Sequence, residues 1–375
     1  MSRTVCLLAS ALEYPEGGGQ LWLYLNWALG LRALGCEVVW LELVPDRPEA
    51  AGLLANVRAL KEQLEEHELS RNLALGFKSG AIVPEPIAGQ CLSVEAAVES
   101  ELLLDFQYDT PDELVRQFRT TALVDIDPGL LQIWQSHGTM NFAPHDFYFS
   151  IGETVGRPDA LFPGCGVPWH YTAPPIYLPA WPVTVSGPDA AFTTVAHWWY
   201  GEMEWKGETF SNDKRASFLS FLELPALTTE KLELALALGD NKEERPFWES
   251  HGWRVRDSWQ VCGTADGYRD YIRGSRGEFS CAKPSCMRLQ NAWISDRTLC
   301  YLASGKPAIV QHTGPSRFLP EAEGLFRFRT MAEAASALET VESDYERHCV
   351  SARQLAEEHF DATKVLRRVL ETALP

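Results

Sequence analysis

The first 43 residues are the segment that most restricts how this chain can fold. Residues 4–11, TVCLLASA, form a short apolar run, and the glycine-rich residues 12–20 follow it. Residues 21–35, LWLYLNWALGLRALG, carry apolar residues at helical spacing and end at Gly35, and CEVVWLEL at 36–43 is a second apolar run. This order predicts strand, loop, helix and strand, a βαβ unit that requires a parallel sheet with a right-handed crossover.

The same kind of pattern begins again in the second half of the chain. AFTTVAHW at 191–198 predicts a new strand, and DKRASFLSFLELP predicts a helix that is closed by Pro225. Between the halves, residues 170–191 contain five prolines and no periodicity, which is typical of a linker. We therefore predict an amino-terminal domain over 1–184, a second domain over 185–355 and a final helix over 356–375 that packs back on the first domain.

Length, charge and cysteine content limit the class of protein. A chain of 375 residues is long enough for two cores. The net charge of −18 disfavours binding to nucleic acid or anionic lipid. The nine cysteines contain no CxxC pair, and no apolar stretch approaches the ~20 residues of a spanning helix. We expect a cytoplasmic protein with reduced thiols, no signal peptide, no integral membrane segment and no nucleic-acid partner.

Four motifs in the second half occur in a recognisable order. They include the sequence Ala303-x-Gly305-x-Pro307, which joins the end of a predicted helix to the next strand. The motifs are RGSRGEFSCAK (273–283), SDRTLCYLASGKPAIVQHTG (295–314), FLPEAEGLFRF (318–328) and ARQLAEEHFDATKVLRRVL (352–370). Together with the glycine loop near the amino terminus, they resemble the GT-B superfamily of nucleotide-sugar-dependent glycosyltransferases, over residues 4 to about 370.

This resemblance implies an α/β fold of two Rossmann-like domains that face a central cleft. The second domain would bind a nucleotide-diphosphate sugar, UDP- or TDP-linked, as co-substrate without any other cofactor. The first domain would bind the acceptor, which is a small molecule, a glycan or a natural product. Transfer would be independent of metal ions, because cationic side chains and a helix terminus would stabilise the leaving diphosphate.

Several residues are candidates for binding the donor. Ser295 begins a predicted helix whose amino end suits a diphosphate, and Arg297 and Thr298 could add a guanidinium and a hydroxyl. The turn after the next strand carries His312 and Thr313, at the strand end where open α/β sheets bind ligands. Other candidates are the phosphate-binding lysine, for which Lys206 and Lys214 both qualify, the loop residues Arg276 and Lys283, and the glycine-loop residues Gly18 and Gly19.

The chain departs from the family at the positions that bind ribose. Many retaining members carry two glutamates there, eight positions apart, but this sequence has Ala292 and Cys300. Asp296 lies one helical turn before Cys300 on the same face and is our candidate substitute.

The candidates for acid–base chemistry are Asp127, His145 and Glu278. Asp127 belongs to the motif DIDP with Asp125 at the end of a predicted strand, and we expect this pair to act without a metal ion. His145 lies in APHDFYFSIGE, where Asp146 and Glu153 are its rivals, and Glu278 lies between two predicted donor-site cations. Of the thirteen tryptophans, those in AHWWYGEMEW are the ones that we expect beside the ligand.

Two other functions fit the same sequence. One is a sugar-nucleotide epimerase on the same scaffold, and the other is a catalytically idle nucleotide-sugar-binding or scaffold protein, which the missing glutamate pair favours. A nicotinamide-dependent enzyme fits poorly, because neither domain's first predicted strand is followed by a GxGxxG motif.

Overall fold

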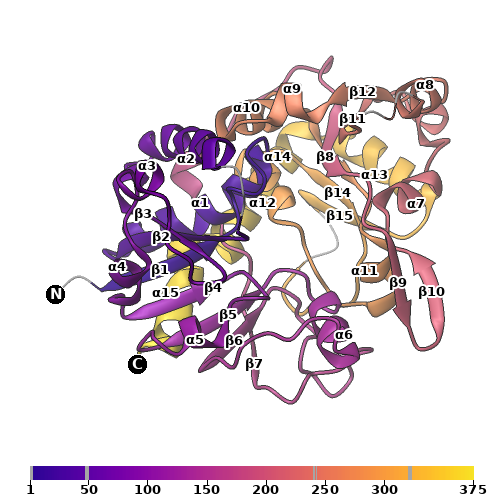
Figure 1. Ribbon diagram of the computed structural model, residues 1–375. Helices are drawn as coiled ribbons and strands as arrows, with labels where there is room; N and C mark the ends of the chain where they lie inside the picture. Colours follow the sequence, from indigo (N-terminus) through magenta and orange to yellow (C-terminus); the bar gives the residue numbers. More distant parts are fainter. Residues whose placement is uncertain (1–2, 47–49, 240, 242, 320–322) are drawn as a thin grey trace. The chain divides into compact units, whose positions relative to one another are not determined.

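The computed structural model describes residues 3–46, 50–239, 241, 243–319 and 323–375 (Figure 1). Residues 320–322 of the FLPEAEGLFRF motif therefore lie outside the described residues. The chain divides into two compact units. Unit 1 comprises Met1–Pro158, Phe162–Tyr177 and Ala362–Pro375, and unit 2 comprises Asp159–Leu161 and Leu178–Asp361.

Unit 1 is built on a parallel sheet with strand order β3-β2-β1-β4-β5-β6-β7. Its strands are β1 (Thr4–Ala9), β2 (Glu37–Val44), β3 (Leu73–Phe77), β4 (Leu102–Asp105), β5 (Thr121–Asp125), β6 (Phe147–Ser150) and β7 (Trp169–Tyr171). Its helices are α1 (Gly18–Ala33), α2 (Ala50–Glu65), η1 (Ser70–Asn72), α3 (Glu85–Ala88), α4 (Val94–Val98), α5 (Asp112–Val115), α6 (Leu130–His137) and α15 (Ala362–Ala373).

The opening βαβ unit forms as the sequence predicts. Strand β1 pairs in parallel with β2, and Val5 lies opposite Val38. Helix α1 is followed by Gly35 with a positive φ of 82°, the left-handed conformation that lets the chain turn back toward the sheet.

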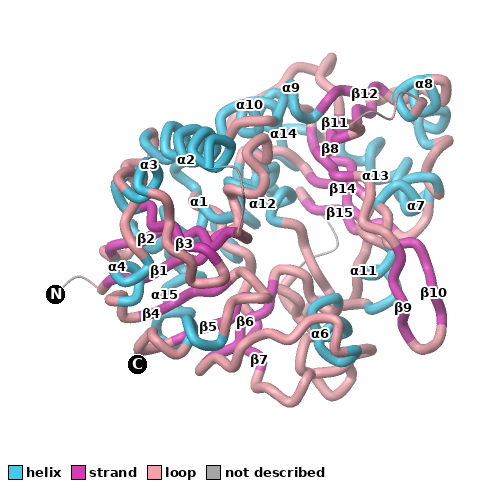
Figure 2. The backbone as a smooth tube through the Cα atoms, in the orientation of Figure 1, coloured by secondary structure: helices cyan, strands magenta, loops and turns pink. Residues whose placement is uncertain are grey.

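Unit 2 contains a second parallel sheet with strand order β12-β11-β8-β13-β14-β15 (Figure 2). Its strands are β8 (Phe192–His197), β11 (Leu232–Ala237), β12 (Arg254–Asp257), β13 (Gly277–Ser280), β14 (Ala308–Gln311) and β15 (Leu325–Phe328). A separate antiparallel hairpin of β9 (Glu202–Trp205) and β10 (Glu208–Ser211) is inserted after β8. The sheet has the order of the doubly wound dinucleotide-binding fold, which confirms the predicted α/β class.

The helices of unit 2 connect these parallel strands. They are η2 (Leu178–Ala180), α7 (Lys214–Leu219), η3 (Leu224–Leu227), α8 (Glu244–Glu249), α9 (Ser258–Cys262), α10 (Ala265–Gly274), α11 (Pro284–Leu289), α12 (Asp296–Ala303), α13 (Met331–Ser343), α14 (Tyr345–Leu355) and the π-helical turn η4 (Ala356–Phe360). Thr330 caps α13 together with Glu333, as its sequence predicts. The predicted helix over 213–225 is shorter, because α7 ends at Leu219 and Pro225 lies in η3.

The core of unit 2 is rich in aromatic residues. Trp198, Trp248 and Trp253 are buried there, and Phe279 stacks on Phe328 with ring centroids 5.3 Å apart. Trp198 of the AHWWYGEMEW motif is thus a core residue, whereas the next residue, Trp199, is exposed. We therefore keep the prediction of a ligand contact for the exposed residues of this motif, such as Trp199, and not for Trp198.

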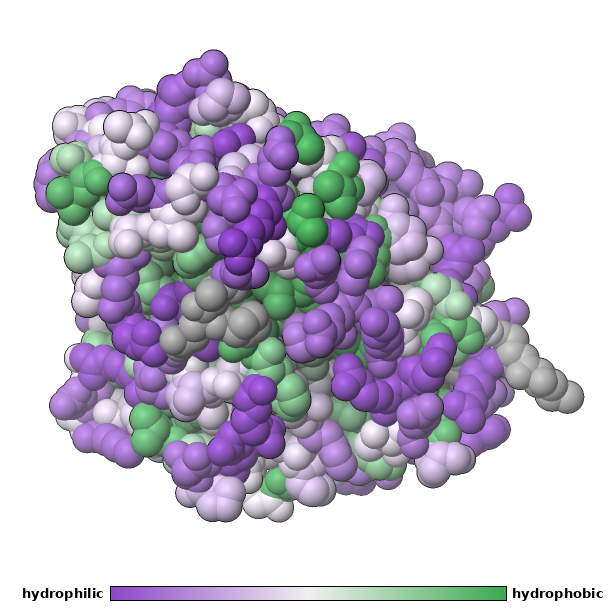
Figure 3. Space-filling model, turned by 180° about the vertical axis from the view of Figure 1, so that it is seen from behind, coloured by the Kyte–Doolittle hydropathy of each residue, from purple (hydrophilic) through white to green (hydrophobic). Residues whose placement is uncertain are grey.

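The surface of the chain is largely polar. Figure 3 shows one face on which hydrophilic residues predominate and hydrophobic residues form small separate groups. Among the residues that the structure describes, no helix has the length and apolar character needed to cross a membrane.

The carboxy-terminal helix α15 packs on α1 within unit 1. Its first residue, Ala362, donates a backbone hydrogen bond to the carbonyl of Ile176. Gly30 of α1 lies directly under α15, because a Cβ atom at this position would come within 2.6 Å of Ala362 Cβ and of Leu366 Cδ1. The absence of a side chain at Gly30 allows the two helices to approach closely.

We expect the substitution Gly30→Val to destabilise the protein by about 1–3 kcal/mol, because the added side chain forces α15 away from α1. Urea unfolding followed by circular dichroism measures this. Gly52→Ala is the matched control, since a Cβ at Gly52 of α2 meets nothing within 4 Å. The control should be neutral or stabilising by up to about 1 kcal/mol. Equal stability of Gly30→Val and wild type would contradict this account of the packing.

Candidate functional site

The carboxyl ends of β8 and β13 mark the place where the strand order of unit 2 reverses. These two strands are neighbours in the sheet, but β8 is followed in the chain by β11 on one side, and β13 by β14 on the other. Open α/β sheets bind ligands outside the strand ends at such a reversal, because the connecting loops diverge there. The loops that follow β8, β13 and β14 are therefore the first place to look for a site in unit 2.

Lys214, the first residue of α7, has an unusual environment at this edge. The residue is only 5% exposed, and within the described residues its ammonium forms no hydrogen bond or ion pair. Burial lowers the pKa of Lys214 to about 7, and the positive charges of Arg297 and Lys283 lower it further, while nearby Cys286 and Asp296 raise it. A largely buried ammonium group that is not paired with a carboxylate is energetically costly, so this position favours an anionic ligand.

The two residues before Lys214 hold it in place. The side-chain oxygen of Asn212 accepts a hydrogen bond of 3.0 Å from the backbone N–H of Ser285. The carboxylate of Asp213 accepts hydrogen bonds from the backbone N–H groups of Tyr200 and Gly201. These two consecutive side chains thus link the start of α7 to α11 and to the loop that follows β8. The sequence analysis missed Asn212 and Asp213, although an Asn-Asp pair directly before a helix is a recognisable capping signal.

The structure distinguishes between the two candidate lysines. Lys206 lies in the turn between β9 and β10, where it is exposed and has a positive φ of 53°. Its ammonium lies 5.7 Å from the centre of the Trp205 ring. Lys214, by contrast, is buried at the edge of the sheet. The charge of Lys283 lowers the pKa of Lys214, and the Lys283 ammonium lies 4.1 Å from the centre of the Tyr200 ring.

The start of α12 differs from the predicted phosphate site. Ser295 is the N-cap residue, but its side chain makes no capping hydrogen bond. Asp296 lies in the first turn of α12, and burial raises the pKa of its carboxyl, while the charges of Arg297 and Lys214 lower it. Thr298 beside it is buried. A carboxyl group at this helix terminus competes with an anionic ligand, so the binding of a diphosphate by these amides stays a prediction.

Arg297 is a structural residue in this conformation, which corrects its predicted contact with phosphate. Its Nε donates a hydrogen bond of 2.8 Å to Glu278 Oε1, and its Nη1 donates one of 2.9 Å to the Val195 carbonyl. A third hydrogen bond joins it to the Ser280 hydroxyl. Glu278 is fully buried in β13 and paired with this guanidinium, so its predicted role as an acid or base is also wrong.

Arg276 lies at the opposite edge of the sheet from Lys214. Arg276 directly precedes β13, at the amino end of that strand. Both terminal nitrogens of its guanidinium donate hydrogen bonds within the protein. Its guanidinium forms two hydrogen bonds of 2.7 Å to the Glu342 carboxylate and lies 3.2 Å from the centre of the Tyr345 ring. The prediction of Arg276 as a donor ligand is therefore wrong, because a parallel sheet places the two ends of a strand at different edges.

His312 and Thr313 form a turn after β14 and make contacts within the protein. The Thr313 hydroxyl donates to the Trp293 carbonyl, and Gly314 N–H donates to His312 Nδ1 at 3.2 Å. The preceding residue, Gln311, accepts a hydrogen bond of 3.0 Å from the Ala282 N–H. These polar residues at the end of β14 thus connect it to the neighbouring loops.

In unit 1, Asp127 follows β5 and is partly exposed. The Tyr108 hydroxyl accepts hydrogen bonds from the Ile126 and Asp127 N–H groups and lies 3.4 Å from Asp127 Oδ2. Asp125 is fully buried, and its carboxylate accepts hydrogen bonds from Gln132, Ser150 and the backbone. Burial raises the pKa of Asp125 to about 7. Of the DIDP pair, Asp127 is the residue that can reach a ligand.

His145 is not a base in this structure. Its Nδ1 lies 2.8 Å from the Ala143 carbonyl, and its Nε2 lies 3.2 Å from Asp105 Oδ2. Both ring nitrogens therefore lie within hydrogen-bond distance of acceptor groups of the protein. The side chain is only 1% exposed, which also separates it from solvent. Its rival Asp146 accepts two hydrogen bonds from Thr121, and Glu153 is buried.

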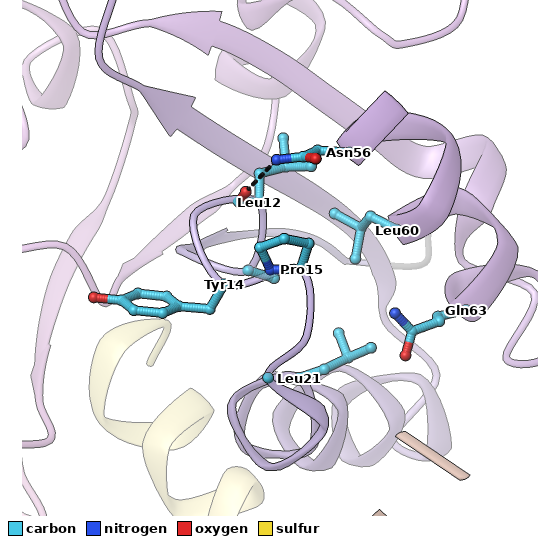
Figure 4. Close-up of a pocket in the computed structure, with 9 residues that line it drawn as sticks. Leu12, Tyr14, Pro15, Leu21, Asn56, Leu60 and Gln63 are labelled. Carbon is cyan, nitrogen blue, oxygen red and sulfur yellow. Dashed lines mark hydrogen bonds between the residues drawn. The ribbon is translucent and has the colours of Figure 1, made fainter. Parts of the chain in front are cut away.

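The glycine-rich loop leads directly into α1. Gly17 is the N-cap residue, and Gly18 and Gly19 form the first turn of the helix. Beside this loop lies a pocket with about 270 Å³ of open space, between the loop, α1 and α2 (Figure 4). Asn56 lines it and donates a hydrogen bond of 3.2 Å to the Leu12 carbonyl, while the Tyr14 ring points away.

Comparison with known proteins supports the fold. No protein-family model matches the sequence, and a search of curated protein sequences also finds no match. Among solved structures, an alpha-glucosyltransferase in complex with UDP-glucose and DNA containing an abasic site matches with a TM-score of 0.57 and 11% identity, over 100% of both chains. Anabaena Alr3699/HepE in complex with UDP and glucose matches with a TM-score of 0.57 and 12% identity, over 99% of both chains. The chain therefore has the GT-B fold that its sequence motifs predict.

We expect Lys214→Met to stabilise the free protein by about 1–4 kcal/mol at pH 7, because it replaces a buried unpaired charge by an apolar group of similar length. The folded-state pKa of about 7 lies below the ordinary value for lysine. The gain in the free energy of unfolding should therefore be full below pH 7. It should disappear as the pH rises to about 10, because lysine is then neutral in the unfolded chain as well. Urea unfolding at pH 7 and pH 10 measures both effects.

Lys206→Met is the control for the loss of one charge and should change stability by less than about 0.5 kcal/mol. Destabilisation of Lys214→Met at pH 7 would show that the ammonium has a counter-ion in the free protein.

We expect Arg297→Met to destabilise the protein by about 3–5 kcal/mol, because it leaves the Glu278 carboxylate buried without its partner. The double variant Glu278→Met/Arg297→Met should recover most of this loss, since neither charge then remains. Urea unfolding of the two single variants and the double variant gives the coupling energy. If Arg297→Met kept full stability and lost only nucleotide binding, the guanidinium would be a ligand and not a structural group.

Proposed function

We propose that this protein is a glycosyltransferase that moves a sugar from a UDP-linked donor to an acceptor. The observation that carries the proposal is the buried Lys214 ammonium, which lies at the strand-order reversal of unit 2 and forms no ion pair among the described residues, although the Asp296 carboxylate lies near enough to favour its charge. The solved structures that resemble this chain contain UDP, with glucose or as UDP-glucose, on the same fold. A diphosphate supplies the negative charge that the Lys214 environment lacks.

In this proposal the diphosphate binds to Lys214, with Lys283 as a second cation. When the bond between the sugar and the diphosphate breaks, negative charge builds up on the leaving phosphate oxygen. A positive charge that is already fixed in a poorly solvated position stabilises this oxygen without any rearrangement. The two ammonium groups can perform this role without a metal ion, and we propose transfer of that kind. Asp296 is proposed to accept hydrogen bonds from the ribose in place of the glutamate pair.

Unit 1 is proposed to bind the acceptor, with Asp127 as the base that removes the proton of its hydroxyl group. Asp127 is partly exposed and lies beside the Tyr108 hydroxyl, whereas Asp125 and His145 are fully engaged in protein hydrogen bonds. Gly18 and Gly19 are proposed to let the backbone of the loop approach the donor. The proposed acceptor is a small molecule, a glycan or a natural product.

The first test is a thermal-shift series with UDP, TDP, GDP and ADP. A nucleotide at 100 times its dissociation constant should stabilise the protein by about 2.7 kcal/mol. We expect UDP to give the largest shift in wild type and in Lys206→Met, and a much smaller one in Lys214→Met, because only Lys214 is buried at the sheet edge. No shift with any nucleotide would contradict the proposal.

Enzymatic function is tested separately with UDP-glucose and a mixture of candidate acceptors. Formation of a glycosylated product supports transfer, and its rate should fall about 100-fold or more in Asp127→Asn. Conversion of the sugar without any acceptor would instead indicate an epimerase. Tight binding of UDP without turnover would indicate an idle nucleotide-sugar-binding protein.

A further inference from the structure

His197 is the last residue of β8, and the sequence analysis did not select it. It is exposed, and its imidazole packs edge-on against the Tyr200 ring with centroids 5.4 Å apart. The Tyr200 ring therefore holds the imidazole from one side.

Partial burial lowers the pKa of His197, and the charges of Lys214 and Lys283 lower it further, while the Trp199 backbone and Asp213 act in the opposite direction. This environment favours the neutral ring, which carries a lone pair on one of its two nitrogens. No side chain among the described residues forms a hydrogen bond with the imidazole.

A neutral nitrogen lone pair selects one kind of ligand group. It repels phosphate oxygens, which also carry lone pairs, and it accepts a hydrogen bond from a hydroxyl. A nucleotide sugar has hydroxyl groups on its ribose and on the transferred sugar. The proposed function assigns Asp296 at the start of α12 to the ribose. The ring next to His197 belongs to Tyr200, and Trp199 precedes it in the chain. These two residues are 39% and 38% exposed, and exposed aromatic rings suit the apolar face of a sugar ring.

We propose that His197 accepts a hydrogen bond from a hydroxyl group of the transferred sugar, with Trp199 and Tyr200 as the aromatic wall of this subsite. The inference rests on the proposed function, because it assumes that the diphosphate binds at Lys214. It adds to that function the residue that distinguishes a complete nucleotide sugar from the nucleotide alone.

The test is isothermal titration of wild type, His197→Ala and His197→Gln with UDP and with three UDP-sugars, namely those of glucose, galactose and N-acetylglucosamine. We expect His197→Ala to bind UDP within twofold of wild type and to bind the tightest of the three sugars about tenfold more weakly, the value of one hydrogen bond. His197→Gln should recover most of the loss, since its amide oxygen also accepts. His137→Ala, which removes an exposed histidine of unit 1, is the matched control and should change neither affinity.

The outcomes separate the two proposals. An equal loss of affinity for UDP and for the UDP-sugar in His197→Ala would overturn the inference, because the residue would then act on the nucleotide or on the fold. Unchanged affinity for both ligands would overturn it as well. If wild type binds none of the ligands, the proposed function fails and the inference fails with it.

Discussion

The buried ion pair between Arg297 and Glu278 is the interaction on which unit 2 depends. Through one guanidinium, helix α12 is joined to β13 by a carboxylate and a hydroxyl, and to β8 by a backbone carbonyl. The two strands that border the reversal of strand order are thus fixed to the helix that follows them. Glu278 Oε2 remains buried without a hydrogen bond among the described residues, so the guanidinium is essential for keeping this carboxylate in the core.

This pair also shapes the environment of Lys214. The guanidinium charge is one of the causes that depress the lysine pKa, because it lies close by in a poorly solvated region. Lys214 is therefore a second cation beside Arg297, whose charge is already neutralised by Glu278. Such an arrangement costs stability in the free protein and is compensated when an anion binds. Stability and ligand binding are opposed at Lys214, as is common where a site is preorganised for charge.

The polar residues at the strand ends have two different roles. Asp105, Asp125 and Gln311 lie at the carboxyl ends of their strands and accept hydrogen bonds from neighbouring loops or side chains. Their function is to hold the loops in position. Lys214 at the start of α7, His197 at the end of β8 and Asp127 after β5 are our candidates for contact with a ligand. Position at the end of a strand therefore selects candidates, and the hydrogen-bond partners decide among them.

The sequence alone determined the fold class and several caps. The glycine-punctuated βαβ pattern at 4–43 and the Ala303-x-Gly305-x-Pro307 motif are local signals, because strand, turn and helix preferences act over short distances. Site assignments were less successful for the same reason. We predicted Arg276, Arg297 and Glu278 as site residues, yet each is paired inside the protein. Arg276 forms an ion pair with Glu342, and Arg297 forms one with Glu278.

Only the tertiary structure decided which charges remain unpaired. The choice of Lys214 over Lys206 depends on burial at a sheet edge rather than in a hairpin turn, and the exclusion of His145 depends on a partner forty residues away, Asp105. Pairing and burial are set by contacts between distant segments, whereas sequence patterns report only local preference. For this reason the sequence determined where the strands end, and the tertiary structure determined which side chains there are used in contacts within the protein.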